Sequence, residues 1–116
     1  MPIKNFLKME PKLSVCHNGE GLIKIVNIFD KDDFATSLQF IHFTVLPPTT
    51  SIGFHTHGND EEIYIVMEGS GTMETDGKKT YVSAGDMILN KPYGSHALYN
   101  TSESEELKIL VFGVKI

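Results

Sequence analysis

The chain has 116 residues, of which 41% are hydrophobic and 22% are charged. A chain of this length accommodates one domain with its own core, and this composition excludes an intrinsically disordered protein. The net charge of −5 and the scattered lysines argue against nucleic acid and against an anionic membrane surface as partners.

Cys16 is the only cysteine, so an internal disulfide is excluded and no secreted disulfide framework is indicated. We expect its side chain to be small, buried and inert. Charged residues interrupt residues 1–13, so this segment has no apolar core of signal-peptide length, and no stretch of the chain is apolar enough to span a membrane. A cytoplasmic location is therefore the default expectation.

Short strands separated by regular turns account for most of the chain. Residues 1–21 are expected to form an irregular N-terminal segment, and residues 22–116 one β-domain. Pro47 and Pro48 end a long apolar strand, residues 30–37 favour a loop over a short helical turn, and Asp76-Gly77 predicts a type I′ hairpin turn. The expected strands cover residues 22–29, 38–46, 51–57, 62–68, 72–75, 79–83, 87–90, 95–99 and 107–115. This pattern indicates an all-β fold, an antiparallel β-barrel or jelly roll.

Two histidines at alternate positions begin the candidate site. His55 and His57 lie on one face of an expected strand, since successive side chains alternate faces. Either Glu61 or Glu62 faces them from the next strand, and His96 follows a Pro-Tyr-Gly turn at the start of a later one. Three imidazoles and a carboxylate suit zinc, iron, manganese or nickel. The alternative is that the two histidines near the turn are solvated surface groups.

These residues resemble the first motif of the cupin superfamily. That motif has two histidines flanking one residue, then three or four residues, a glutamate, six residues and a glycine. It matches His55, His57, Glu62 and Gly69, and the spacing to the glycine selects Glu62 over Glu61.

The second cupin motif follows in order along the chain. It begins at a glycine, has a histidine eleven positions later and an asparagine four beyond that, and it matches Gly85, His96 and Asn100. This motif usually has proline and glycine at the positions of Lys91 and Tyr93, whereas here Pro92 and Gly94 each come one residue later. The two motifs together cover about residues 49–100.

The resemblance implies a small single-domain cupin that binds one divalent metal ion per chain, iron, manganese, nickel or zinc, through His55, His57, Glu62 and His96. Cupins include dioxygenases, isomerases and lyases, so it implies a metal-dependent small-molecule enzyme. The alternative is a non-catalytic module that binds or senses a small ligand. The chain has no arginine, the residue with which oxalate-type decarboxylases of this family hold a dicarboxylate, so we expect a neutral or weakly charged substrate.

Further residues are candidates beside the metal ligands. Tyr64 shares the inward face with Glu62, and is either a hydrogen-bond donor or general acid, or a core tyrosine. His42 is either a proton carrier in the pocket or a partnered core or surface histidine. His17 is expected to be structural or solvated, with a place in the pocket as the alternative. Strands that are apolar on both faces, together with the common pairing of cupins, lead us to expect a homodimer.

Overall fold

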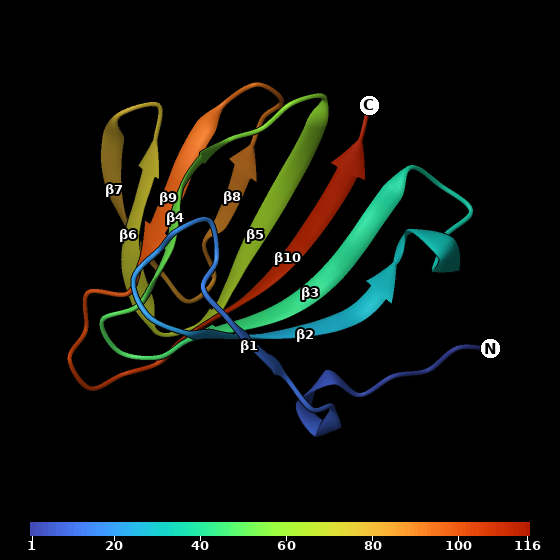
Figure 1. The fold of residues 1–116 in the computed structure, drawn as a ribbon, viewed down its shortest axis with the longest axis horizontal. Helices are drawn as coiled ribbons and strands as arrows, with labels where there is room; N and C mark the ends of the chain where they lie inside the picture. Colours follow the sequence, from blue (N-terminus) through green and yellow to red (C-terminus); the bar gives the residue numbers. More distant parts are fainter.

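The computed structural model describes all 116 residues, which form ten strands and two short 3₁₀ turns joined by turns and loops (Figure 1). The turns are η1 (Phe6–Lys8) and η2 (Lys31–Asp33). The strands are β1 (Lys12–Ser14), β2 (Ile23–Asp30), β3 (Leu38–Leu46), β4 (Ser51–Thr56), β5 (Asp60–Glu68), β6 (Ser70–Thr75), β7 (Lys78–Ser83), β8 (Met87–Asn90), β9 (Ser95–Tyr99) and β10 (Leu107–Lys115). The structure contains no helix with the length and apolar character needed to cross a membrane.

The strands form two antiparallel sheets that face each other. One sheet has the order β1-β2-β3-β10-β5-β8 and the other the order β4-β9-β6-β7. In Figure 1 the four-stranded sheet lies on the left, and the six-stranded sheet curves away from it towards β2. The expected all-β antiparallel class is confirmed, although the strands form two sheets and do not close into a single barrel.

Most strands lie where the sequence predicts them. The bounds of β3, β8, β9 and β10 are those expected, and Asp76 (φ 48°) and Gly77 (φ 83°) both have the positive φ of the predicted type I′ turn. Two local expectations are wrong. Lys12–Ser14, expected to be irregular, pairs with β2 as a short edge strand, and Lys31–Asp33, expected to be loop, forms a 3₁₀ turn because Asp30 and Asp33 cap it reciprocally.

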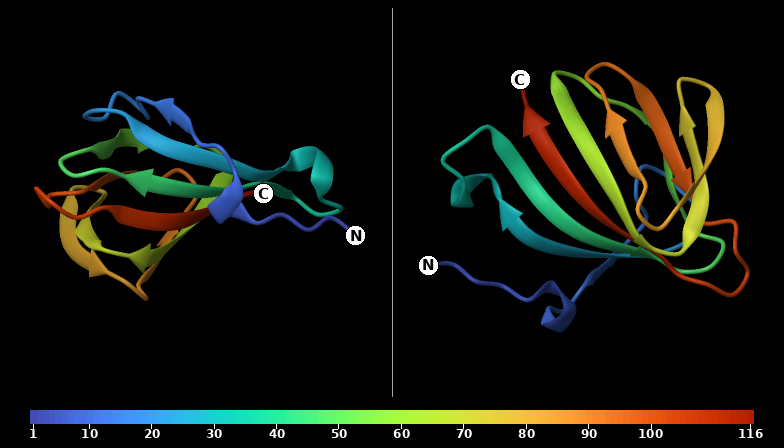
Figure 2. Two further views of the ribbon diagram at one scale, coloured as in Figure 1. Left: turned by 90° about the horizontal axis from the view of Figure 1, so that it is seen from below. Right: turned by 180° about the vertical axis from the view of Figure 1, so that it is seen from behind.

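Alternation of side chains gives the six-stranded sheet two apolar faces. The inner face contributes to the core between the sheets, where Tyr64 and Val66 are 2% and 1% exposed on the same side as Glu62, as predicted. The outer face carries a second cluster of buried residues, which consists of Val26, Ile28, Phe43 and Val45. Phe6 and Met9 pack against this cluster, so the N-terminal segment lies against the outside of the sheet (Figure 2).

Candidate metal centre

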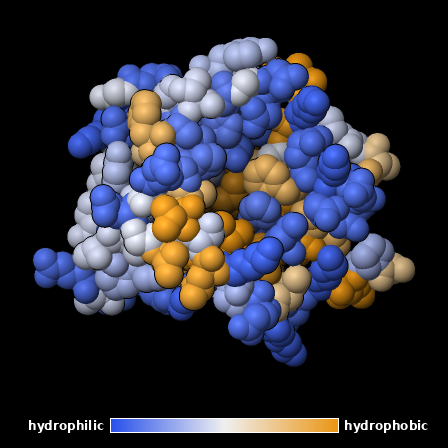
Figure 3. All heavy atoms as spheres, in the orientation of Figure 1, coloured by the Kyte–Doolittle hydropathy of each residue, from blue (hydrophilic) through white to orange (hydrophobic).

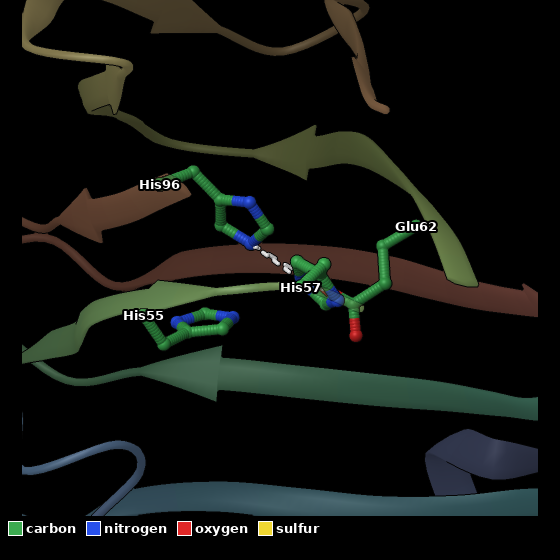
Figure 4. A group of neighbouring side chains, drawn as sticks. All are labelled: His55, His57, Glu62 and His96. Atoms are coloured by element: carbon green, nitrogen blue, oxygen red, sulfur yellow. Dashed lines mark hydrogen bonds and ion pairs between the residues drawn. The ribbon is translucent and has the colours of Figure 1, made fainter. Parts of the chain in front are cut away.

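Four side chains converge between the two sheets. His55 comes from β4, His57 follows directly after β4, His96 comes from β9 and Glu62 from β5. Their nearest nitrogen and oxygen atoms all lie within 4.8 Å of one another, and Figure 4 shows the side chains pointing towards a common point. Residues His55 and His96 are directly opposed in the β4–β9 pair, which explains how positions 41 apart in the sequence meet.

The distances between these atoms suit a bound ion. His57 Nε2 lies 3.3 Å from His96 Nε2 and 3.3 Å from Glu62 Oε1, and His96 Nε2 lies 3.5 Å from the same oxygen. Metal–ligand bonds of about 2.0–2.2 Å place two ligands about 3 Å apart at right angles and about 4.2 Å apart when opposed. The three separations among His57, His96 and Glu62 therefore match those expected between neighbouring ligands of one divalent ion.

Hydrogen bonds orient two of the imidazoles. His55 Nδ1 donates to the carbonyl oxygen of Gly53 at 2.8 Å, and His57 Nδ1 donates to Asp60 Oδ2 at 2.8 Å. A carboxylate or carbonyl that accepts from the outer nitrogen, Nδ1, orients each ring so that its Nε2 faces the centre. The contact of Asp60 with His57 was not anticipated from the sequence, although its position three residues after His57 in a polar turn is a usable signal.

His55 carries the strongest sign of a missing partner. Its Nε2 is buried and has no hydrogen-bond partner. The pKa of His55 is lowered to about 4, mainly because the ring is buried. The hydrogen bond to Gly53 raises the pKa but does not offset the effect of burial. The ring is therefore neutral at pH 7 and keeps the lone pair that a metal requires. The donor set and this unpartnered nitrogen fit a divalent metal ion.

Tyr64 lies directly beside the four ligands. Its hydroxyl is 3.2 Å from His96 Nε2, and the side chain is buried. Burial and, to a lesser extent, the charge of Glu62 raise the pKa of Tyr64 well above its usual range, so the phenol stays protonated at neutral pH. The Tyr64 hydroxyl therefore lies at the centre, on the inward face expected for it.

His42 lies on β3 and lines the same cavity as Glu62 and Tyr64. It makes no hydrogen bond or ion pair with the four residues, and its ring packs 4.3 Å from the ring of Phe40. Burial lowers the pKa of His42 and the charge of Glu62 opposes this effect. His42 therefore faces the cavity, as expected of a pocket residue, but the structure does not bring it to the centre.

The cavity adjoins the centre at Glu62 and Tyr64 and has a volume of about 260 Å³. Figure 3 shows a hollow on this face of the molecule, with hydrophobic side chains inside it. Its apolar walls are formed by Ile23, Ile25, Phe40, Ile52 and Val111, and its polar walls by Cys16, His17, His42 and Thr44. No lysine lines it.

A strap formed by residues 16–20 covers one side of the centre, which the sequence did not reveal. The His17 ring stacks on the His55 ring with centroids 3.6 Å apart and an interplanar angle of 11°. The amides of Gly19 and Gly53 both donate to the carbonyl oxygen of Cys16, at 2.9 and 3.0 Å. His17, expected to be structural or solvated, is therefore part of the cavity wall.

Cys16 differs from the expectation of a buried side chain. It is only half-buried and lines the cavity. Burial, followed by the charge of Glu62, raises the pKa of the Cys16 thiol, which keeps it in the protonated and unreactive form.

Comparison with known proteins places the chain among relatives of the same fold. It is 27% identical over 94 residues to the oxalate-binding protein of Thermotoga maritima. The aligned region covers 81% of this chain and 78% of that protein. It is 36% identical over 72 residues to an uncharacterized protein of Methanocaldococcus jannaschii, over 62% of this chain and 57% of that protein. A crystal structure described as a predicted oxalate decarboxylase from Thermotoga maritima superposes with a TM-score of 0.94 at 24% identity, covering 99% of this chain and all of the other. The family model of the cupin domain matches residues 42–113, and the chain therefore belongs to the cupin domain family.

Proposed function

We propose that the protein binds one divalent metal ion, iron, manganese, nickel or zinc, through His55, His57, Glu62 and His96, and uses it to transform a small molecule. The reaction would be of the dioxygenase, isomerase or lyase class. The observation that carries this proposal is the convergence of four ligand atoms within 4.8 Å, one of them the buried and unpartnered Nε2 of His55. Membership of the cupin domain family supports it.

The residues around the centre have separable roles in this proposal. A divalent ion would supply Lewis-acid polarisation of a carbonyl or hydroxyl oxygen, or redox chemistry if it is iron, manganese or nickel. The Tyr64 hydroxyl, protonated and 3.2 Å from His96 Nε2, would donate a proton to a ligand bound beside it. His42, on the cavity wall, would accept or carry a proton, and the apolar walls would exclude water from the reacting atoms.

Metal content is the direct test. We expect elemental analysis of protein purified without added metal to find about one iron, manganese, nickel or zinc per chain. The His57→Ala variant should lose this metal, because it removes one ligand. His42→Ala is the matched control and should retain it, because His42 contacts none of the four ligands. Wild-type protein that carries no metal, and takes none up when zinc is offered, would overturn the proposal.

The cavity supports a neutral or weakly charged ligand with an apolar body. No lysine lines it, the chain has no arginine, and Lys24 lies outside it in a surface ion pair with Glu106 at 3.7 Å. A cavity of about 150 Å³ holds benzene, so the volume of about 260 Å³ accommodates a one-ring molecule. Two neighbouring oxygens on such a body would suit a metal with open positions.

Titration with two chelating probes tests the ligand class. Catechol and oxalate both offer two neighbouring oxygens, but catechol is neutral at pH 7 with an apolar ring, whereas oxalate is a dianion without one. We expect zinc-loaded protein to bind catechol at least about tenfold more tightly than oxalate, because burying a dianion without a cationic side chain is costly, whereas burying an apolar ring is favourable. Calorimetry measures both affinities, and metal content measured afterwards controls for extraction of the zinc. Tighter binding of oxalate would contradict the prediction.

A non-catalytic binding protein is the second candidate function. The specific observation that favours it is that one relative is described as an oxalate-binding protein. The two candidates differ in the fate of the ligand, which an enzyme converts and a binding module returns unchanged. Both require the same centre and cavity.

We also propose that the outer face of the six-stranded sheet binds a second copy of the chain. Two cross-strand rows of apolar side chains lie side by side on this face of β10, β5 and β8. They are Phe112, Ile63 and Leu89 in one row, and Leu110, Ile65 and Met87 in the next. Met87 is 66% exposed and Leu89 is 51% exposed, and a contiguous apolar surface of this kind is typical of a self-association interface.

Mass measurement tests the homodimer. Light scattering at low micromolar concentration should give a dimeric mass, and Leu89→Glu should give a monomer, because it buries a charge in the proposed interface. Phe54→Glu is the control, since Phe54 is also 51% exposed but lies on β4 in the other sheet. A monomeric wild-type protein would contradict the proposal.

A further inference from the structure

Asn90, the last residue of β8, is a buried polar side chain without a partner. It is 2% exposed, and neither its Oδ1 nor its Nδ2 makes a hydrogen bond. The only other buried side-chain nitrogen or oxygen without a partner is Nε2 of His55. A buried amide in this state destabilises the fold, so its presence calls for a compensating role.

The strand pairing places Asn90 beside the metal centre. In the β5–β8 pair, Asn90 is directly opposite Glu62. Opposed residues of an antiparallel pair project from the same face, with Cβ atoms about 4.5–5.5 Å apart. Leu89, which projects from the other face, is 51% exposed, so Asn90 and Glu62 share the inner face.

Asn100 shows how this chain treats a buried asparagine with a structural role. It is also 2% exposed, but its Nδ2 donates to three carbonyl oxygens and its Oδ1 accepts from the Ser102 amide. The three acceptors are the carbonyl oxygens of Leu46, Pro47 and Glu105, at 2.8–3.1 Å. The side-chain amide of Asn90 therefore has no hydrogen-bond partner, whereas that of Asn100 is hydrogen-bonded through both its nitrogen and its oxygen.

We propose that Asn90 is a positioning residue of the metal centre, an inference that rests on the proposed metal site. Glu62 contacts His57 and His96 through Oε1, so its other oxygen, Oε2, is the one open to Asn90. When a metal ion draws Oε1 into the centre, the Nδ2–H of Asn90, unpartnered in this structure, would donate to Oε2 and fix the carboxylate in the orientation that ligation needs. The Oδ1 of Asn90 is left to accept a hydrogen bond from a water or hydroxyl at the centre.

The Asn90→Leu variant separates this role from a merely structural one. Leucine has the same branching but no polar atoms, so removing the unpartnered amide should raise the Tm of the metal-free protein, by about 3 °C. The same change should weaken zinc binding about 10- to 100-fold, as loss of an outer partner of a metal ligand does. The Tm is measured in chelator, and the zinc Kd by competition with a chromophoric chelator. A zinc Kd within twofold of wild type would overturn the proposal.

Asn100→Leu is the matched control and should behave in the opposite way. It should lower the Tm strongly and leave the zinc Kd unchanged, because its hydrogen bonds are structural. If Asn90→Leu does not fold, the side-chain amide signals of wild-type protein provide the test by NMR. On zinc addition, the Asn90 NH₂ protons should shift and exchange more slowly, with the Asn100 signals as the internal reference. Asn90 signals that do not respond would overturn the proposal.

The zinc affinity of the wild-type protein separates the two levels of the argument. Wild-type protein that binds no zinc would overturn both the metal site and the role of Asn90. Wild-type and Asn90→Leu proteins that bind zinc equally would overturn the role of Asn90 alone.

Discussion

Replacing Gly53 with alanine is expected to lower the free energy of unfolding by about 3 kcal/mol, the upper part of the usual range for overpacking. A Cβ at this position would overlap the carbonyl oxygen of His17 and lie 2.7 Å from the Gly19 nitrogen. Both atoms belong to backbone and cannot rotate away. The strap would have to leave β4, and the hydrogen bond from Gly53 to the Cys16 carbonyl would be lost with it.

Urea unfolding measures this effect, and Gly58→Ala provides the matched control. A Cβ at Gly58 would meet nothing within 4 Å, so its free energy of unfolding should change by less than about 0.5 kcal/mol. Equal effects of the two substitutions would show that the strap does not depend on the close approach of backbone at Gly53.

Replacing Glu62 with glutamine is expected to weaken metal binding about 100-fold or more. The substitution keeps the shape of the side chain but removes the charge that a divalent ion requires. Loss of an outer partner of a metal ligand costs about 10- to 100-fold, so the change of a proposed direct ligand should cost more. The zinc Kd, measured by competition with a chromophoric chelator, reports the loss.

Glu61→Gln is the control for this prediction because it makes the same chemical change one residue away. Glu61 projects from the opposite face of β5 and is not one of the four clustered residues. Its zinc Kd should stay within about twofold of wild type. A larger loss in Glu61→Gln than in Glu62→Gln would mean that the wrong carboxylate has been assigned to the centre.

The sequence was sufficient for those features that depend on local pattern. Apolar strands ended by proline or glycine predicted β3 and β8 to their terminal residues, and the need for positive φ predicted the turn at Asp76 and Gly77. The two-residue period assigned Glu62 and Tyr64 to one face. The residue spacing within the two motifs then predicted which four side chains cluster.

Features that depend on contact between distant segments could not be predicted. The strap reaches β4 because two glycines, Gly19 and Gly53, let two stretches of backbone approach, and no periodicity records such an approach. β1 has only three residues, which is too short for an alternating pattern. Asn90 has a residue type that usually marks a turn, so its burial opposite Glu62 became visible only with the strand register.

The division of the four candidate ligands between the sheets would also affect the lifetime of a metal-bound protein. His55 and His96 belong to the four-stranded sheet, whereas Glu62 belongs to the six-stranded sheet. An ion bound by all three residues would link the two sheets. At a free metal concentration of 100 times the Kd, binding would raise the free energy of unfolding by about 2.7 kcal/mol. Proteases cleave unfolded molecules, so the metal supply would then govern how long each molecule survives. A cell short of the metal would contain less of the protein as well as less of its metal-bound form.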